Sequence, residues 1–163
     1  MSDAAAHKPV RIVRATAADA GRLAPIFTEY RVFEGREPDL AGAEAFLREL
    51  LERGESVLYM AVVRPSYPCD DEPVVGFAHL CPAFSSASMR RSWIVNDLFV
   101  AEAFRRRGIA KMLMAAAADH AHAAGARSLT LTTAETNTAA QALYESLGWS
   151  PLPVRFYTLV VDP

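Results

Sequence analysis

Residues 97–110 read Asp-Leu-Phe-Val-Ala-Glu-Ala-Phe-Arg-Arg-Arg-Gly-Ile-Ala, an apolar strand end that runs into a basic turn with one glycine. The alanine-rich stretch that follows predicts a helix over residues 108–124. The first N–H groups of a helix have no intrahelical partner and lie at the positive end of the helix dipole, so this turn suits a pyrophosphate. Three consecutive arginines add charge and forked donors. Taken alone, the stretch also fits a plain surface turn.

Segments of strand and helix character alternate on both sides of this turn. The patterns predict strands over residues 10–15, 56–63, 74–80, 92–100, 128–133 and 155–161, and helices over 16–34, 39–54, 108–124 and 138–147. The strand–helix–strand order after residue 92 implies a right-handed parallel crossover, whereas the earlier strands are expected to pair antiparallel. We therefore predict an α/β fold in which one mixed sheet is covered by helices. Loops are predicted over 65–73 and 82–91.

Composition limits the classes of function. The 163 residues, 52% of them hydrophobic, are enough for one compact domain, and the polar residues 1–9 are expected to form a flexible tail without a secretory signal. A net charge of −2 provides no overall attraction to nucleic acid or to a membrane. Neither Cys69 and Cys81 nor the four histidines have metal-ligand spacing. We expect no metal, reduced thiols and a cytoplasmic location.

A second motif follows the segment that contains Leu129 and Leu131. It reads Asn137-x-x-Ala140-x-x-x-Tyr144-x-x-x-Gly-Trp, on a short predicted helix. Asn137 is placed to cap this helix, and its side chain could instead donate to a ligand amide. Tyr144 lies in the apolar stripe, where a tyrosine is either a core residue with its hydroxyl bonded or a catalytic acid.

The two motifs, in this order and separation, resemble those of the GNAT family of acyl-CoA-dependent N-acetyltransferases. The resemblance extends from Val10 to Val161 and is strongest from Trp93 to Trp149. The pattern Arg105-x-x-Gly108-x-Ala110 is similar to the family's cofactor loop, Arg/Gln-x-x-Gly-x-Gly/Ala. This resemblance implies the GNAT fold, a single three-layer domain over residues 10–163, with acetyl-CoA as the acyl donor.

The resemblance also implies roles for individual residues. Backbone amides of the basic turn would bind the CoA pyrophosphate, and the backbone of Phe99 and Val100 would bind the pantetheine arm. The Val100 N–H would polarise the acetyl carbonyl. Tyr144 would protonate the departing thiolate. The implied cofactor-binding residues are Phe99, Val100, Arg105, Arg106, Arg107, Gly108, Ile109, Ala110, Lys111, Asn137 and Ala140.

Within the family, three segments look similar to the small-amine branch, which includes diamine acetyltransferases. These are residues 30–37, 82–86 and 96–99. That branch commonly has a Glu-Asp pair on the strand before the cofactor loop, with the Glu as general base. Here the pair is Asn96-Asp97, and an asparagine cannot take a proton at neutral pH.

The sequence therefore does not decide which residue is the general base. Asp97 is the catalytic candidate that remains, but adjacent residues of a strand point to opposite faces, so it need not replace the glutamate. A water chain that ends at Asp97, Glu34 or His79 would serve, as would an amine that arrives neutral.

The acceptor side also has two interpretations at each position. Tyr30, Phe33 and Phe84 form either an apolar slot or part of the core. The acidic residues Glu34, Glu37 and Asp39 either attract a cationic amine or form a solvated helix end, while Arg90 and Arg91 would suit an acidic acceptor. The candidate substrate-binding residues are Tyr30, Glu34, Phe84 and Asn96.

The resulting hypothesis is acetyl transfer from acetyl-CoA to a primary amine of a small molecule by direct attack in a ternary complex. Cys81 lies outside both motifs, which speaks against a covalent intermediate. The alternatives are a peptide or protein amine as acceptor, favoured by an open groove, and a non-catalytic acyl-CoA sensor, suggested by Asn96. Family resemblance further suggests a homodimer. The apolar residues 156–161 fit either a contribution to its interface or an internal strand.

Overall fold

The computed structural model describes residues 9–64 and 72–161. Most of the predicted tail, the thiol of Cys69 and most of the loop predicted over 65–73 therefore lie outside the described residues. The chain divides into two compact units, Met1–Thr132 and Thr133–Pro163.

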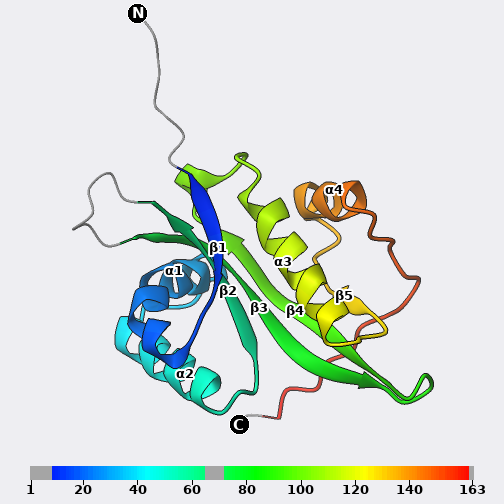
Figure 1. The fold of residues 1–163 in the computed structure, drawn as a ribbon. Coiled ribbons are helices and arrows are strands. Elements are labelled where there is room, and N and C mark those ends of the chain that lie inside the picture. The colour runs from blue at the N-terminus through cyan, green and yellow to red at the C-terminus, as the bar shows by residue number, and fades with distance from the viewer. Residues whose placement is uncertain (1–8, 65–71, 162–163) are drawn as a thin grey trace, which may run out of the picture. The chain divides into compact units, whose positions relative to one another are not determined.

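The first unit is built on a mixed sheet with the strand order β1-β2-β3-β4-β5 (Figure 1). Its strands in the described residues are β1 (Val10–Arg14), β2 (Val57–Val63), β3 (Val74–Ser85), β4 (Arg90–Val100) and β5 (Leu129–Leu131). The first four strands pair antiparallel, and β4 pairs parallel with β5. This arrangement confirms the predicted mixed α/β sheet and its parallel crossover.

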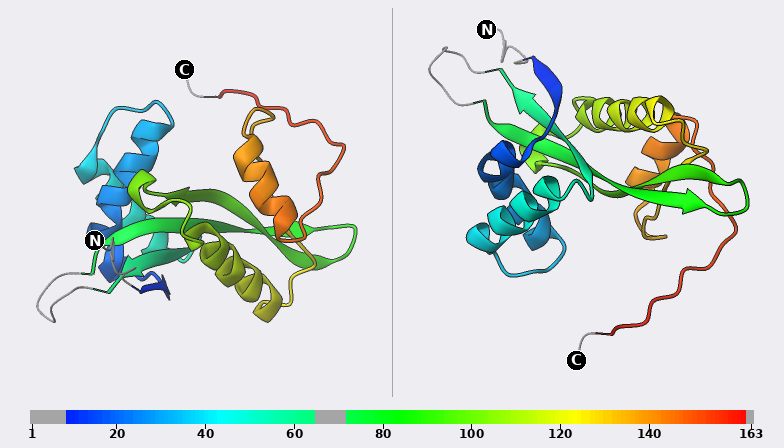
Figure 2. Two further views of the ribbon diagram at one scale, coloured as in Figure 1. Left: turned by 90° about the horizontal axis from the view of Figure 1, so that it is seen from above. Right: turned by 60° about the horizontal axis from the view of Figure 1, so that its bottom comes forward.

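Helices cover both faces of this sheet, as Figure 2 shows. On one face lie α1 (Ala20–Phe33), which follows the short 3-10 turn η1 (Ala17–Asp19), and α2 (Leu40–Glu52). On the other face lies α3 (Ile109–Ala123), which follows the 3-10 turn η2 (Glu102–Phe104). Separate apolar clusters fill the two layers, one around Leu23, Leu47 and Phe77 and one around Leu113. The predicted three layers are thus present in this unit.

Short-range sequence signals explain the helix ends. Thr16 and Asp19 form the expected capping box, with Asp19 Oδ2 accepting from the backbone and the hydroxyl of Thr16. Asp39 caps α2, with its Oδ1 accepting from Gly42 N at 2.8 Å. Because these bonds join residues three apart, they can be predicted without knowledge of the tertiary fold.

Two predictions of secondary structure were wrong. The loop predicted over 82–91 is a tight hairpin, because β3 runs to Ser85 and β4 begins at Arg90. Pro82 is compatible with this strand because β2 pairs with β3 only as far as Leu80, so Pro82 lies where β3 has an open edge. The strand predicted over 155–161 is absent, although its residues are apolar, since a strand needs a hydrogen-bonding neighbour as well as composition.

The second unit contains α4 (Thr138–Ser146) and an extended segment after it. Asn137 caps this helix, with its Oδ1 accepting from Ala140 N at 3.1 Å. Apolar side chains of the segment are strongly exposed, with Phe156 at 81% and Val160 at 78% of full exposure.

Candidate functional site

A β-bulge shapes the middle of β4. His79 pairs with Asp97, whereas the next residue of β3, Leu80, pairs with Val95, so Asn96 is an extra residue on β4. A bulge interrupts the alternation of side chains between the two faces of a sheet. Consequently the Asn96 amide reaches its neighbour and donates to Asp97 Oδ2 at 2.9 Å. The expectation that these two adjacent side chains point to opposite faces was therefore wrong.

Asp97 accepts hydrogen bonds from three side chains of different elements. The Tyr30 hydroxyl, on α1, donates to Asp97 Oδ1 at 2.5 Å. His79 Nδ1, on β3, lies 2.9 Å from Oδ2, and Asn96 completes the set. The Asp97 side chain retains only 11% of its exposure, so these bonds act in a largely desolvated place.

The bonds decide the protonation state of this pair. Burial by itself raises the pKa of Asp97, but the bonds from His79, Tyr30 and Asn96 outweigh it and hold that pKa below its ordinary value. Burial and the bond to Asp97 raise the pKa of Tyr30 well above its ordinary value. At neutral pH the site thus contains a carboxylate facing a phenol that keeps its proton.

A buried polar chain continues from Asp97 into the protein. His79 Nε2 lies 2.8 Å from Ser56 Oγ and 3.6 Å from Cys81 Sγ. His79 is 5% exposed and Ser56 is 7% exposed. Sequence reasoning named His79 only as one possible end of a water chain and missed Ser56. A serine before a strand carries no signal of its own, and this contact appears only when residues 23 apart are brought together.

Aromatic rings surround this polar pair. The Tyr30 ring packs on Phe77 and Phe99, with centroids 5.6 Å and 5.7 Å away, and Phe33 packs on Phe99 at 5.7 Å. Glu34, at the end of α1, adds a negative charge that contributes to the raised pKa of Tyr30. The structure therefore brings Tyr30, a predicted acceptor-binding residue, into contact with Asp97, and places Glu34 where its charge acts on Tyr30.

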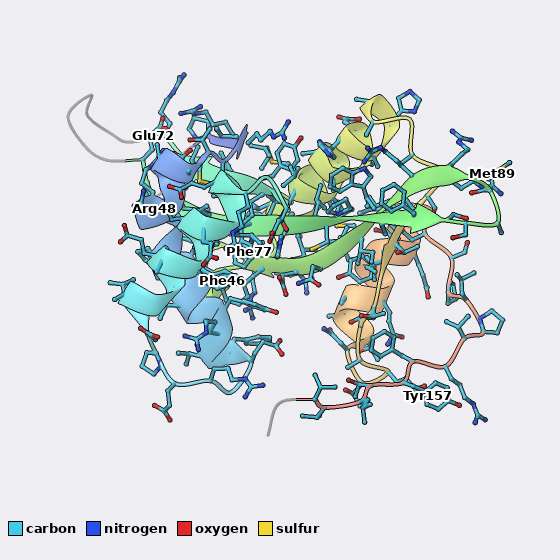
Figure 3. All side chains as sticks on the ribbon, turned by 90° about the horizontal axis from the view of Figure 1, so that it is seen from below. Phe46, Arg48, Glu72, Phe77, Met89 and Tyr157 are labelled. Carbon is cyan, nitrogen blue, oxygen red and sulfur yellow. The ribbon has the colours of Figure 1, made fainter. Side chains whose placement is uncertain are left out.

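Phe84 is not part of this group. It pairs with Arg91 near the turn of the hairpin, five residues along β3 from His79, which corresponds to about 17 Å of strand. The Arg91 guanidinium lies over the Phe84 ring at 5.4 Å, and the ring is 72% exposed. Figure 3 shows Met89, at the hairpin turn, at the end of the sheet that is far from Phe77.

The edge of β4 beyond the bulge is open toward β5. Pairing between these strands extends only from Trp93 to Val95. Ala101 N donates to Val75 O at 2.9 Å, so by alternation Phe99 directs its backbone groups toward β3, while Leu98 and Val100 direct theirs away from it. The open edge therefore offers the N–H groups of Val100, a predicted cofactor residue, and of Leu98, which was not predicted. The backbone of Phe99 was predicted to bind the pantetheine arm, but its groups are directed toward β3 and are not available on this edge.

Arg105 has a different environment from the other arginines of the basic turn. Its Nε donates to Val100 O at 2.9 Å. Its guanidinium lies 5.4 Å from the Phe33 ring centroid and 5.6 Å from that of Phe99. These contacts leave the Arg105 side chain joined to the strand end and the aromatic rings, where it orders the turn.

The basic turn has the backbone geometry of an anion site. Arg106 and Gly108 have positive φ angles of 63° and 78°, a conformation that concentrates successive N–H groups on one side. In α3, Met112 N is bonded to Gly108 O, so the N–H groups of Ile109, Ala110 and Lys111 precede the first helical bond. The turn and the open edge of β4 thus fit a pyrophosphate joined to an extended amide chain.

The second unit holds the other predicted cofactor residues. Its Asn137 oxygen is engaged in the helix cap with Ala140, which favours the capping interpretation of this asparagine. The Tyr144 ring packs near Trp149 at 6.1 Å, and burial raises the pKa of Tyr144, which keeps its hydroxyl protonated at neutral pH. Contacts of Asn137, Ala140 and Tyr144 with a cofactor stay predictions.

Within residues 9–64 and 72–161, no group of three or more His, Cys, Asp or Glu side chains is arranged to hold a metal ion. In the same part of the chain, no helix combines the length and apolar character of a membrane span.

Comparisons with known proteins place the chain among acetyltransferases. The profile described as "Acetyltransferase (GNAT) family" matches residues 24–149. The "Uncharacterized N-acetyltransferase YhfO" of Bacillus subtilis (strain 168) is 42% identical over 140 residues, which cover 86% of this chain and 89% of that protein. The crystal structure of "a probable acetyltransferase" matches with a TM-score of 0.83 at 36% identity, over 94% of this chain and 99% of the other. The "Aminoglycoside N-Acetyltransferase AAC(6')-Iy in Complex with CoA" is similar in fold at 20% identity, with a TM-score of 0.73, over 94% of this chain and 96% of that one.

Proposed function

The chain belongs to the GNAT family of acetyltransferases, and on that premise we propose that it transfers acetyl from acetyl-CoA to a primary amine of a small molecule by direct attack. One observation carries the choice of acceptor. Asp97, an ionised carboxylate, lies on the strand whose open edge begins at the same bulge, bonded to Tyr30, on which the charge of Glu34 acts. Such a place attracts a cationic amine.

Enzymes of the GNAT family use acetyl-CoA, and the bound thioester supplies the acetyl group. The turn from Arg106 to Lys111 would hold the pyrophosphate by its backbone N–H groups. The Val100 N–H would bind the acetyl oxygen and stabilise the negative charge that develops on it. A cationic amine would first lose one proton to water, and the neutral amine would attack. Asp97 would receive the second proton, which the nitrogen loses as the C–N bond forms, and Tyr144 would donate a proton to the departing sulfur.

Asn96 does not exclude this chemistry. The resemblance to the small-amine branch sets it at the position of that branch's glutamate base, and its amide donates to Asp97. We therefore propose that the chain resembles that branch in substrate class and differs from it in the carboxylate used. We further propose that the protein is cytoplasmic and that it forms a homodimer. The exposed apolar residues of the C-terminal segment support the dimer.

Release of free CoA in the presence of different amines tests the function. The purified protein would be given acetyl-CoA with 1,3-diaminopropane, spermidine, kanamycin or a peptide with a free N-terminus, and the thiol measured. We expect saturable release with at least one small amine. Release with the peptide alone would move the acceptor class to peptide amines. Tight acetyl-CoA binding without release for any amine would indicate a sensor.

Tyr144→Phe tests the proposed acid. We expect the mutant to lose kcat by roughly 100-fold, because it cannot protonate the leaving thiolate, while its Kd for acetyl-CoA in calorimetry stays unchanged. Tyr157→Phe is the matched control, since Tyr157 is 80% exposed in the same unit. Equal turnover of Tyr144→Phe and wild type would remove Tyr144 from the mechanism.

A further inference from the structure

His79 is a buried side chain with both ring nitrogens engaged. Nδ1 lies 2.9 Å from Asp97 Oδ2 and Nε2 lies 2.8 Å from Ser56 Oγ. An apolar residue would fill the same volume without the cost of burying a polar ring. We therefore expect the His79 ring to have a role besides packing. It contacts the Asp97 carboxylate directly.

The hydrogen bonds around Asp97 leave part of its carboxylate free to accept a further hydrogen bond. A carboxylate has about four lone-pair positions, two on each oxygen. His79 and Asn96 use both positions of Oδ2, and Tyr30 uses one of Oδ1. One position on Oδ1 remains for a further donor, such as the N–H of an amine or of a bridging water.

We infer that His79 is a positioning residue of the transfer: it holds Asp97 in the rotamer that turns the open position of Oδ1 to the acceptor, and Ser56 fixes the His79 ring. This inference rests on the proposed function. The chain of bonds joins β4 to β3 through His79, to α1 through Tyr30 and to the residue before β2 through Ser56. It anchors the bulge on three neighbours, so the carboxylate cannot rotate without breaking several bonds.

The same arrangement couples His79 to the pH dependence of the reaction. The titratable groups that contact Asp97 are Tyr30 from α1 and His79 from β3. Glu34, just after α1, acts on Tyr30, Cys81 contacts His79, and Arg105 lies over the Phe99 ring. Loss of a donor to the carboxylate makes the ionised form less stable. The acidic limb of the kcat/KM profile then moves to higher pH.

Two substitutions separate this role from packing. His79→Leu removes both bonds, whereas His79→Asn places an amide N–H near the position of Nδ1 and so retains a donor to Asp97. His120→Leu and His120→Asn are matched controls, because His120 lies on α3 against Tyr59 and Trp93, on the other face of the sheet. Ser56→Ala tests the far end of the chain.

Rates of CoA release would be measured across a pH series, with whichever of 1,3-diaminopropane, spermidine and kanamycin the wild type uses best. We expect His79→Leu to lower kcat by roughly tenfold to 100-fold and to move the acidic limb to higher pH, with KM for acetyl-CoA unchanged. His79→Asn should retain most of the wild-type rate, and its acidic limb should lie close to the wild-type pH. Ser56→Ala should lose roughly threefold. The His120 variants should match wild type.

Several results would overturn the inference. One is an unchanged acidic limb in His79→Leu while wild type is active. Another is an equal loss in His79→Asn and His79→Leu that follows only their melting temperatures, which would make His79 a packing residue. If the wild type itself releases no CoA with any of the amines, the proposed function is contradicted, and the inference with it. The wild-type assay alone therefore distinguishes this failure from a failure of the role of His79.

Discussion

Asp97 owes its chemistry to neighbours that are distant in sequence. Tyr30 and His79 are separated from it by 67 and 18 residues, and both donate to the same carboxylate. Asn96, its neighbour in sequence, adds a third bond only because the bulge turns both side chains to one side. A residue that sequence reasoning left as an uncertain substitute for a glutamate is thus the centre of a polar network.

Tyr30→Phe tests this network at the scale of one hydroxyl. The ring contacts with Phe77 and Phe99 are preserved, and the 2.5 Å bond to Asp97 is lost. We expect the free energy of unfolding to fall by about 1.5–3 kcal/mol at neutral pH, the range for hydrogen bonds to charged groups. Urea unfolding at neutral and at acidic pH measures this loss.

The sign of the pH dependence follows from the pKa of Asp97, which is lowered in the folded protein. Its contribution to stability is present above the pKa of the unfolded chain and disappears as the pH falls through the folded value. The difference between Tyr30→Phe and wild type should therefore shrink in acid. A difference that stays constant with pH would mean that the hydroxyl does not act through Asp97.

At the scale of the element, the start of α3 combines local signals with a fixed place in the sheet. Gly108 precedes the helix with a φ of 78°, and Gly125 follows it with a φ of 66°. Both glycines adopt a backbone conformation that is costly for other residues. Only Gly108 belongs to the turn that we propose as the pyrophosphate site, so the two ends of one helix provide an internal comparison.

Gly108→Ala and Gly125→Ala use this comparison. An added methyl group at either position would meet no described atom within 4 Å, so both changes should cost about 1–2 kcal/mol through backbone strain alone. We expect only Gly108→Ala to raise KM for acetyl-CoA, by roughly tenfold, because the methyl group obstructs close approach of a phosphate. Similar KM values for the two variants would argue against this turn as the cofactor site.

At the scale of the whole molecule, the C-terminal segment is the part whose structure was predicted least well from its composition. Residues 155–161 have the apolar character of a strand, yet Phe156 and Val160 are 81% and 78% exposed. Apolar surface of this extent on one segment is typical of an interaction site. The proposed homodimer would cover it.

The double substitution Phe156→Ser, Val160→Ser tests that role. Because both side chains are exposed, we expect the free energy of unfolding at low protein concentration to change by less than about 0.5 kcal/mol. Light scattering after gel filtration should show a dimer for wild type and a monomer for the variant. Met89→Ser, at a position 91% exposed on the hairpin turn, should leave the dimer intact. A dimeric double variant would exclude this segment as the interface.

The amino-acid sequence by itself determined the helices, most of the strands and the position of the basic turn before α3, because caps, apolar periodicity and a glycine with positive φ act over a few residues. The tertiary structure alone decided which side chains surround Asp97. It brought Tyr30, Ser56 and His79 to Asp97 and moved Phe84 away, since these placements depend on strand register and on one extra residue in β4. Register is set by the packing of the whole sheet, and shifting it by one residue exchanges the faces of every side chain on the strand.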